Sequence, residues 1–203
     1  MKAELDKALC EKYPKIFAQR HLPMSETCMC WGFAHGDGWY NIIAALCGAI
    51  QWHIDQREKD IERYKRWQVE RTAALAGDWT AFNKKHEKSL NDPKWAAWIE
   101  KEKQELVAPE VPKWVIPKDP IPQVEAVQVK EKFGALRFYY EGGDEYIRGL
   151  VTMAEAMSAH TCEVCGAPGE ARGGNWVLTL CDEHHSDRSW KDTNAVNSTQ
   201  EER

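Results

Sequence analysis

The stretch CEVCGAPGEARGGNWVLTLCDEH, residues 162–184, contains two pairs of potential metal ligands with the same internal spacing. Two residues separate the members of each pair, and fifteen residues lie between Cys165 and Cys181. Two pairs spaced in this way supply the four ligands of a tetrahedral zinc site. The sequence therefore predicts a structural zinc ion bound by Cys162, Cys165, Cys181 and His184.

The fourth ligand and the metal itself each have an alternative. His185 would leave three residues between the last two ligands, a spacing that zinc sites also accept, and the same side chains could be buried without a metal. Four protein ligands leave no open position for a water, so zinc-dependent hydrolysis is not expected. HNH-type nucleases carry similar cysteine pairs, but no histidine lies between Cys165 and Cys181 to act as base or ligand.

The order of local structures in this stretch is also informative. Gly166 permits a tight turn with positive φ after the first pair, residues 176–180 have the composition of a strand, and the last pair opens a helix. This order resembles a treble-clef zinc finger over about residues 160–190. The resemblance concerns the fold alone and implies no function.

Composition limits the class of protein. Apolar residues make up 43% and charged residues 29% of the 203 residues, which is ordinary globular usage. Because no apolar run could span a bilayer and the N-terminus lacks the apolar centre of a secretory signal, we expect a cytoplasmic protein that binds no membrane. In a reducing compartment, seven cysteines indicate metal binding rather than disulfides.

The charge selects no partner. A nonspecific binder of duplex DNA needs a basic surface, and the formal net charge here is -5. Residues 161–203 carry a net charge of -4, which weakens the alternative that the zinc finger itself binds nucleic acid. The mixed charges are also too dilute for a mimic of DNA. The oligomeric state stays open.

Helical spacing of apolar residues dominates the first half of the chain. It predicts a helix over 3–19 that ends at Pro23, followed by one long helix, or two with a break, over 38–76. Asp37 is expected to be the N-cap of this long helical segment. Two shorter helices are predicted after it, the second with Pro93 in its first turn.

The second half changes character after five prolines between residues 109 and 122. β-Branched and aromatic residues on both sides of Gly134 predict a β-hairpin, and Asp144 is expected to cap a helix over 145–158. The predicted fold is therefore α+β. Its expected parts are a helical region 1–107, a proline-rich connector 108–122, a hairpin with a helix 123–160, the zinc finger 161–190 and a disordered tail 191–203.

A second group of thiols and imidazoles lies in the first quarter of the chain. Its members are Cys28, Cys30, His35, Cys47 and His53, together with the carboxylate of Asp37. Such side chains could bind a second zinc ion or include a nucleophile. The enzyme that this alternative implies would use Cys28 or Cys30 with His35, or the carboxylates of Glu26 and Asp37. Their spacing is irregular, and Cys47 falls on the apolar stripe of its helix, so packing is the competing interpretation. We assign no catalytic residue.

Two segments combine polar groups with aromatic rings, as binding sites do. In the glycine-bearing loop the candidates are Glu26, Trp31, Asp37 and Trp39. In the hairpin the candidates are Lys130, Lys132 and Arg137, beside Tyr139 and Tyr140. In such a mixture the cations can bind phosphate and the aromatic rings can stack on bases. The first set would also be explained if its residues were helix caps or lay at the edge of the core. The second set would also be explained by a solvated strand face, where Glu131 and Glu141 offset the positive charge.

Several motifs together resemble one protein family. They are ETCMCWG at 26–32, GDGWY at 36–40, QVKEKFGALRFYYEGGD at 128–144, and CEVCG with LCDEH. They resemble a family of small uncharacterised proteins encoded by bacteriophages and prophages. The resemblance implies a setting in the bacterial host cytoplasm and supplies no catalytic residues. It favours a non-enzymatic protein that sequesters a nucleotide signal or binds a host protein to counter defence, with an enzyme as the alternative.

Overall fold

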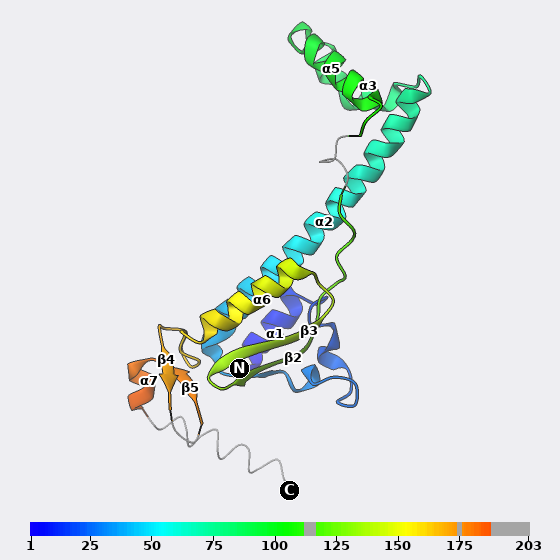
Figure 1. Ribbon diagram of the computed structural model, residues 1–203. Helices are drawn as coiled ribbons and strands as arrows, with labels where there is room; N and C mark the ends of the chain where they lie inside the picture. The colour runs from blue at the N-terminus through cyan, green and yellow to red at the C-terminus, as the bar shows by residue number, and fades with distance from the viewer. Residues whose placement is uncertain (112–116, 174–175, 188–203) are drawn as a thin grey trace. The chain divides into compact units, whose positions relative to one another are not determined.

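The computed structural model describes residues 1–111, 117–173 and 176–187 and has an α+β fold (Figure 1). The chain divides into two compact units. Unit 1 comprises Met1–Ile54 and the described residues from Ile121 onward, and unit 2 is Asp55–Pro120. The first 54 residues, part of the expected helical region 1–107, therefore belong to the same compact unit as the hairpin.

Unit 1 is built on a three-stranded sheet with the order β1-β2-β3. The short strand β1 (Phe33–Ala34) pairs in parallel with β2 (Glu125–Lys132), and β2 pairs in antiparallel with β3 (Ala135–Glu141). Lys132 faces Ala135 across a two-residue turn, in which Phe133 and Gly134 both have positive φ. This confirms the predicted hairpin.

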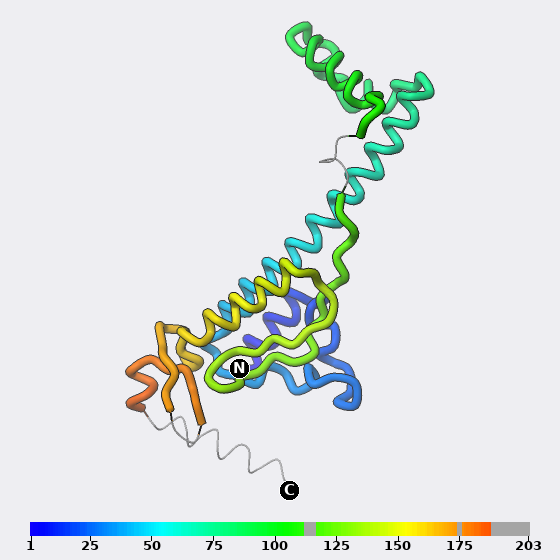
Figure 2. Tube along the Cα trace, in the orientation of Figure 1, coloured from blue at the N-terminus to red at the C-terminus, as the bar shows by residue number. Residues whose placement is uncertain are grey.

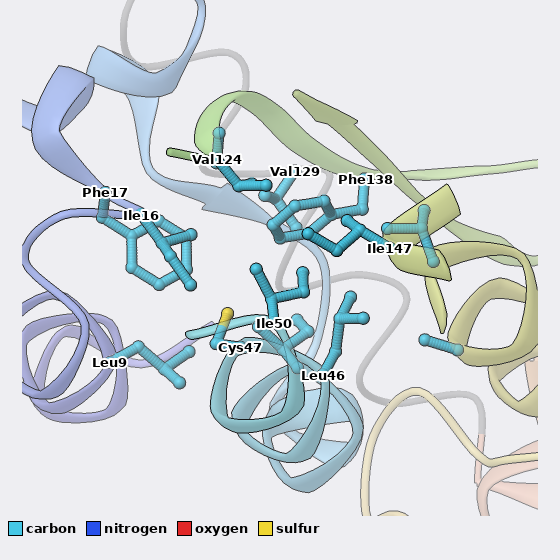
Figure 3. Packing of buried hydrophobic residues seen from close by; sticks show 14 of the residues in the cluster. Leu9, Ile16, Phe17, Leu46, Cys47, Ile50, Val124, Val129, Phe138 and Ile147 are labelled. Carbon is cyan, nitrogen blue, oxygen red and sulfur yellow. The ribbon is translucent and has the colours of Figure 1, made fainter. Parts of the chain in front are cut away.

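The core of unit 1 lies between one face of this sheet and the helices α2 (Tyr40–Leu75) and α6 (Glu145–Ser158). Figure 3 shows Val129 and Phe138 of the sheet directed toward Leu46 and Ile50 of α2. Cys47 is fully buried among them, so the prediction that it serves packing is confirmed. Because residues of opposite parity alternate along a strand, the other face of β2 and β3 carries the polar side chains.

Helix α6 completes the sheet by covering the outer edge of β3. The hydroxyl oxygen of Ser158 accepts from the backbone N–H of Leu136 at 2.8 Å, and a carboxylate oxygen of Glu155 accepts from that of Phe138 at 2.9 Å. These bonds satisfy two groups that an edge strand leaves unpaired. The predicted cap is confirmed, since Asp144 Oδ1 accepts from the N–H of Ile147 at 3.1 Å.

The N-terminal segment differs from its prediction in two respects. Helix α1 (Ala3–Lys12) ends well before Pro23, because Pro14 disfavours helix in the residue before it. The 3₁₀ turns η1 (Ala18–His21) and η2 (Met29–Trp31) follow. Asp37 is not the cap of α2: it begins the 3₁₀ turn η3 (Asp37–Trp39), and its Oδ1 accepts from the N–H of Lys2 at 2.7 Å.

Unit 2 contains the second half of α2 and several short helices. These are α3 (Thr80–Lys85), α4 (Glu87–Leu90), the 3₁₀ turn η4 (Pro93–Trp95) and α5 (Ala96–Val107). Their small core consists of Ala74, Phe82, Ile99 and Leu106. The long helical segment is thus one continuous helix, and Pro93 occupies the expected first-turn position after the cap Asp92.

A small C-terminal module follows α6 in unit 1, and Figure 2 shows the chain passing directly from that helix into it. The module consists of a tight turn at 162–166, the antiparallel strands β4 (Glu170–Arg172) and β5 (Leu178–Leu180), and the short helix α7 (Asp182–Ser186). The expected tail 191–203 and part of the proline-rich connector lie outside the described residues. Among the described helices, none is both long and apolar enough to cross a membrane.

Candidate metal centre

The first two candidate ligands lie on the turn between α6 and β4. The N–H of Gly166 donates to the carbonyl of Cys162 at 2.9 Å, and the N–H of Cys162 donates to the carbonyl of Ala167 at 2.7 Å. Gly166 adopts φ of +79°, the conformation that the sequence predicts for it. The turn, which we call the knuckle (Cys162–Gly166), therefore holds the Cys162 and Cys165 sulfurs on one side of a tightly closed backbone.

The second two candidate ligands follow β5. Cys181 is the residue before α7, and His184 lies in the first turn of that helix. Arg172 joins the two parts of the module, because its guanidinium lies 2.8 Å from Glu170 on β4 and 2.5 Å from Asp182 on α7. The short hairpin and the helix thus present the second ligand pair to the knuckle.

The four candidate ligand atoms form one compact group. The Sγ and imidazole nitrogen atoms of Cys162, Cys165, Cys181 and His184 all lie within 4.8 Å of one another. Cys165 Sγ is 3.8 Å from Cys181 Sγ, and Cys162 Sγ is 3.8 Å from His184 Nδ1. A tetrahedron with zinc–sulfur bonds of about 2.3 Å has edges of roughly 3.8 Å. The side chains present therefore fit a tetrahedral metal ion.

His185, the alternative fourth ligand, is not part of this group. It is exposed, whereas Nδ1 of His184 lies 3.1 Å from Cys181 Sγ. Because His185 is one residue further along α7 than His184, its side chain lies about 100° further around the helix and points away from the thiols. The structure thus brings together the four residues expected from the spacing, and these could bind a metal ion.

The surroundings of Cys162 and Cys165 shift the pKa values of the two thiols in opposite directions. Burial raises the pKa of the Cys162 thiol, but hydrogen bonds from the backbone of Cys181, Cys165 and Val164 outweigh it and leave this pKa below its usual value. Partial burial and the neighbouring Cys162 and Cys181 sulfurs raise the pKa of the Cys165 thiol to about 11. A divalent cation would relieve the repulsion among three thiolates and allow all of them to lose their protons.

The knuckle also packs on the turn that begins η3. The N–H of Gly38 donates to the backbone carbonyl of Glu163 at 2.8 Å, and the N–H of Gly36 donates to the Glu163 carboxylate at 2.9 Å. A Cβ on Gly38 would lie 2.1 Å from the carbonyl oxygen of Cys162. Both residues must therefore be glycine because the knuckle backbone lies against them, a contact that the GDGWY motif alone did not reveal.

Two groups in this contact have roles other than those expected. Trp39, a candidate ligand-binding residue, is fully buried, and its Nε1 donates to the carbonyl of Thr161 at 2.8 Å. Trp39 therefore anchors the knuckle and does not face a ligand. Burial raises the pKa of Glu163 to about 7, and no feature of the sequence indicated that this carboxylate would be buried.

The second group of thiols and imidazoles does not form a site in the described part of the chain. Cys30 Sγ donates to the carbonyl of Thr27 at 3.2 Å, His35 is buried, and Cys28 is exposed. His53 lies 3.0 Å from Asp144 and packs on Tyr146. Among the described residues, these side chains therefore do not converge on one another as a shared site would require.

The other loop candidates separate. Glu26 lines an open pocket of about 460 Å³ together with residues of β2 and β3, including Tyr139 and Glu141. Trp31 is 76% exposed, and Asp37 forms a 3.2 Å ion pair with Lys2. Glu26 and Glu141 make this pocket acidic, and its described lining includes no lysine or arginine. Because Trp31, Asp37 and Trp39 lie outside it, the structure does not gather the four loop residues into one site.

Unit 2 contains a pocket that the sequence did not indicate. Its volume is about 460 Å³, and Tyr64 and Trp67, whose rings stack at 5.8 Å, lie in its wall. Glu70, Lys85 and other charged residues of both signs complete the lining. The i,i+3 aromatic pair on α2 was a possible signal, but the same spacing is typical of ordinary helix packing.

The chain was also compared with known proteins. No protein-family model, no curated protein and no solved structure matches it.

Proposed function

We propose that the chain is a non-enzymatic binding protein whose C-terminal module is held by a structural zinc ion. The observation that carries the metal is the compact group of four donors from Cys162, Cys165, Cys181 and His184. Three thiolates with one imidazole are typical zinc ligands, and four protein ligands close the coordination shell. The ion would supply folding energy and no open position for a substrate.

The order of the module supports a treble-clef zinc finger. The knuckle carries the first ligand pair, β4 and β5 form a hairpin, and the second pair lies at the start of α7. The zinc would join the two ends of a module whose described residues contain few buried apolar side chains. We infer that it fastens the module to the Gly36–Gly38 turn and thereby to the core of unit 1.

A role in binding is supported by features outside the candidate metal centre. The candidate thiols and imidazoles outside the module have separate packing or hydrogen-bonding partners, and β2 and β3 expose a face of cations and aromatic rings. Following the resemblance of its motifs, we propose that the protein works in the cytoplasm of a bacterium as a phage or prophage product. Its ligand there would be a nucleotide signal or a host protein.

Metal analysis and calorimetry test the proposal. Protein purified without added metal should contain one zinc ion, and Cys165→Ser should contain none. Titration calorimetry with nucleotides, cyclic nucleotides and single-stranded nucleic acid, together with capture from host lysate, should reveal one specific ligand. Absence of bound metal in a folded protein would reject the zinc, whereas silence with every ligand class would reject the binding role.

A further inference from the structure

The outer face of the β2–β3 hairpin gathers cations and aromatic rings. Val129 and Phe138 point into the core, so their cross-strand neighbours of opposite parity point away from it. We call this surface the outer face and define it by Gln128, Lys130, Lys132, Arg137, Tyr139 and the turn residue Phe133. Lys130 pairs directly with Arg137, and Gln128 with Tyr139.

The cations lie beside the rings. The Lys130 ammonium is 5.6 Å from the centre of the Tyr139 ring, and the Lys132 ammonium is 5.4 Å from that of Phe133. Phe133 is 74% exposed and Tyr139 is 40% exposed. Stacking surfaces and positive charges thus alternate along the hairpin.

The acids that dilute the positive charge in the sequence lie toward the two ends of the outer face. Both carboxylate oxygens of Glu131 are engaged away from this face, one by the N–H of Gly134 at 2.6 Å and one by Nε1 of Trp176 at 3.1 Å. Glu141 lies opposite Glu125 at the other end of the strands, where it lines the acidic pocket with Glu26 and Tyr139. Glu155 approaches Arg137 at 4.0 Å, so the positive charge of the outer face is greatest at Lys130 and Lys132, near the turn.

The backbone of Phe133 is strained. Its φ of +56° belongs to the left-handed region, and the two-residue turn with positive φ at both positions favours asparagine followed by glycine. A residue with a Cβ atom is strained in this conformation, because the Cβ lies too close to the following carbonyl oxygen. Packing does not require the ring, because it is exposed. A strained, exposed aromatic residue indicates a role in contact with a ligand.

We propose that the outer face binds single-stranded nucleic acid, with Phe133 and Tyr139 stacking on bases and Lys130, Lys132 and Arg137 contacting phosphates. A sheet face with exposed rings flanked by cations suits unpaired bases, since every base has a face to stack. A duplex hides those faces and calls for a wider basic surface than a chain of net charge -5 offers. This inference deepens the proposed binding role and rests on it.

Fluorescence anisotropy with the zinc-loaded full chain tests the inference. The probes are labelled oligothymidylate and oligouridylate about twelve nucleotides long, and the matching duplex. Both single strands should bind more tightly than the duplex. Contacts with three phosphates give a slope of about -2 for log K against log salt concentration, and Lys130→Gln should reduce its magnitude by about 0.7.

The aromatic variants separate binding from stability. Tyr139→Ala should weaken binding about 5- to 150-fold. Phe133→Asn should weaken binding to a similar extent while its melting temperature stays at or above that of the unmodified protein, because Asn-Gly suits the turn. Lys101→Gln on α5 and Trp52→Leu on α2 remove an exposed charge and an exposed ring elsewhere, and each should leave binding unchanged.

Three outcomes would overturn the inference. One is no binding to either single strand at low salt, another is binding that Phe133→Asn and Tyr139→Ala leave unchanged, and a third is binding of polyglutamate but not of nucleic acid, which would assign the outer face to an acidic protein. All three can occur in a protein that retains zinc and captures another ligand. The proposed function would then stand while this inference fails.

Discussion

His35 is a histidine that the fold keeps neutral. Burial lowers its pKa to about 4 and outweighs the hydrogen bond with the Gly36 carbonyl and the nearby Asp37 and Asp6, while the N-terminal ammonium lowers it further. The ring packs between Phe33 and Trp39. Nε2 has no hydrogen-bond partner in the described structure, so a proton there would add an unpaired buried charge.

We therefore expect a specific loss of stability in mild acid. The unfolded state takes up the proton near pH 6.5 and the folded state only near pH 4, so stability is full above pH 6.5 and falls as the pH drops between these values. The loss is at most about 1.4 kcal/mol per pH unit. Urea unfolding of His35→Phe should show a flatter profile over this window, and parallel profiles for the two proteins would refute this account.

Gly38 offers a test of the contact between the knuckle and η3. Gly38→Ala would place its Cβ 2.1 Å from the Cys162 carbonyl oxygen, so the knuckle must move. We expect a loss of about 2 kcal/mol or more in the free energy of unfolding, together with weaker zinc binding in a competition with a chelating dye. Gly149→Ala is the matched control: nothing lies within 4 Å of its added Cβ, and alanine should stabilise α6 by about 0.5–1 kcal/mol. Equal effects of the two substitutions would contradict the contact.

At the scale of elements, the hydroxyl of Ser158 is one of two side-chain groups that cap the edge of β3. Ser158 is fully buried and accepts from the N–H of Leu136 at 2.8 Å. Ser158→Ala should leave that N–H buried without a partner and cost about 1–3 kcal/mol in thermal or urea unfolding. Thr152→Ala, on the exposed side of the same helix, should change stability by less than about 0.5 kcal/mol. A stable Ser158→Ala protein with unchanged exchange of the Leu136 amide would show that the edge needs no cap.

Local signals predicted the elements well where they acted alone. The Asp144 cap, the apolar face of α6 and the turn at Gly134 are short-range features, and each was confirmed. The prediction failed where a competing local feature was overlooked, as at Pro14, or where a distant partner intervened. The carboxylate of Asp37 could cap a helix, but it instead accepts a hydrogen bond from the backbone N–H of Lys2.

At the scale of the whole molecule, the cluster of Cys162, Cys165, Cys181 and His184 was predictable because the spacing of these residues carries the geometry. The supporting contacts were not, since Glu163 meets Gly36 and Gly38 across more than 120 residues of sequence. Trp39 shows the same limit: its aromatic and polar character fits both a ligand contact and an anchor. Only the fold, which buries it against Thr161, decides between them.

Metal removal should affect the two units differently. Their buried clusters share no residue, so chelation should destabilise unit 1 and spare the core around Ile99 and Leu106. Zinc at a thousand times its Kd contributes about 4 kcal/mol, and a chelator should remove it. Hydrogen exchange should then accelerate in the knuckle and at Trp39, with Ile99 and Leu106 unchanged. Cys165→Ser should reproduce this pattern, and uniform acceleration along the chain would argue against two separate cores.

The docking of the knuckle on the Gly36–Gly38 turn also has a consequence for how fast the protein folds. Joining Gly38 to Glu163 closes a loop of about 125 residues, which costs roughly 4 kcal/mol of chain entropy before any contact repays it. A knuckle already ordered by its ion can dock in one step, whereas a metal-free knuckle must be ordered during docking. Refolding of unit 1 should therefore quicken as free zinc rises, so that the supply of metal sets the pace at which newly made chains reach their native state.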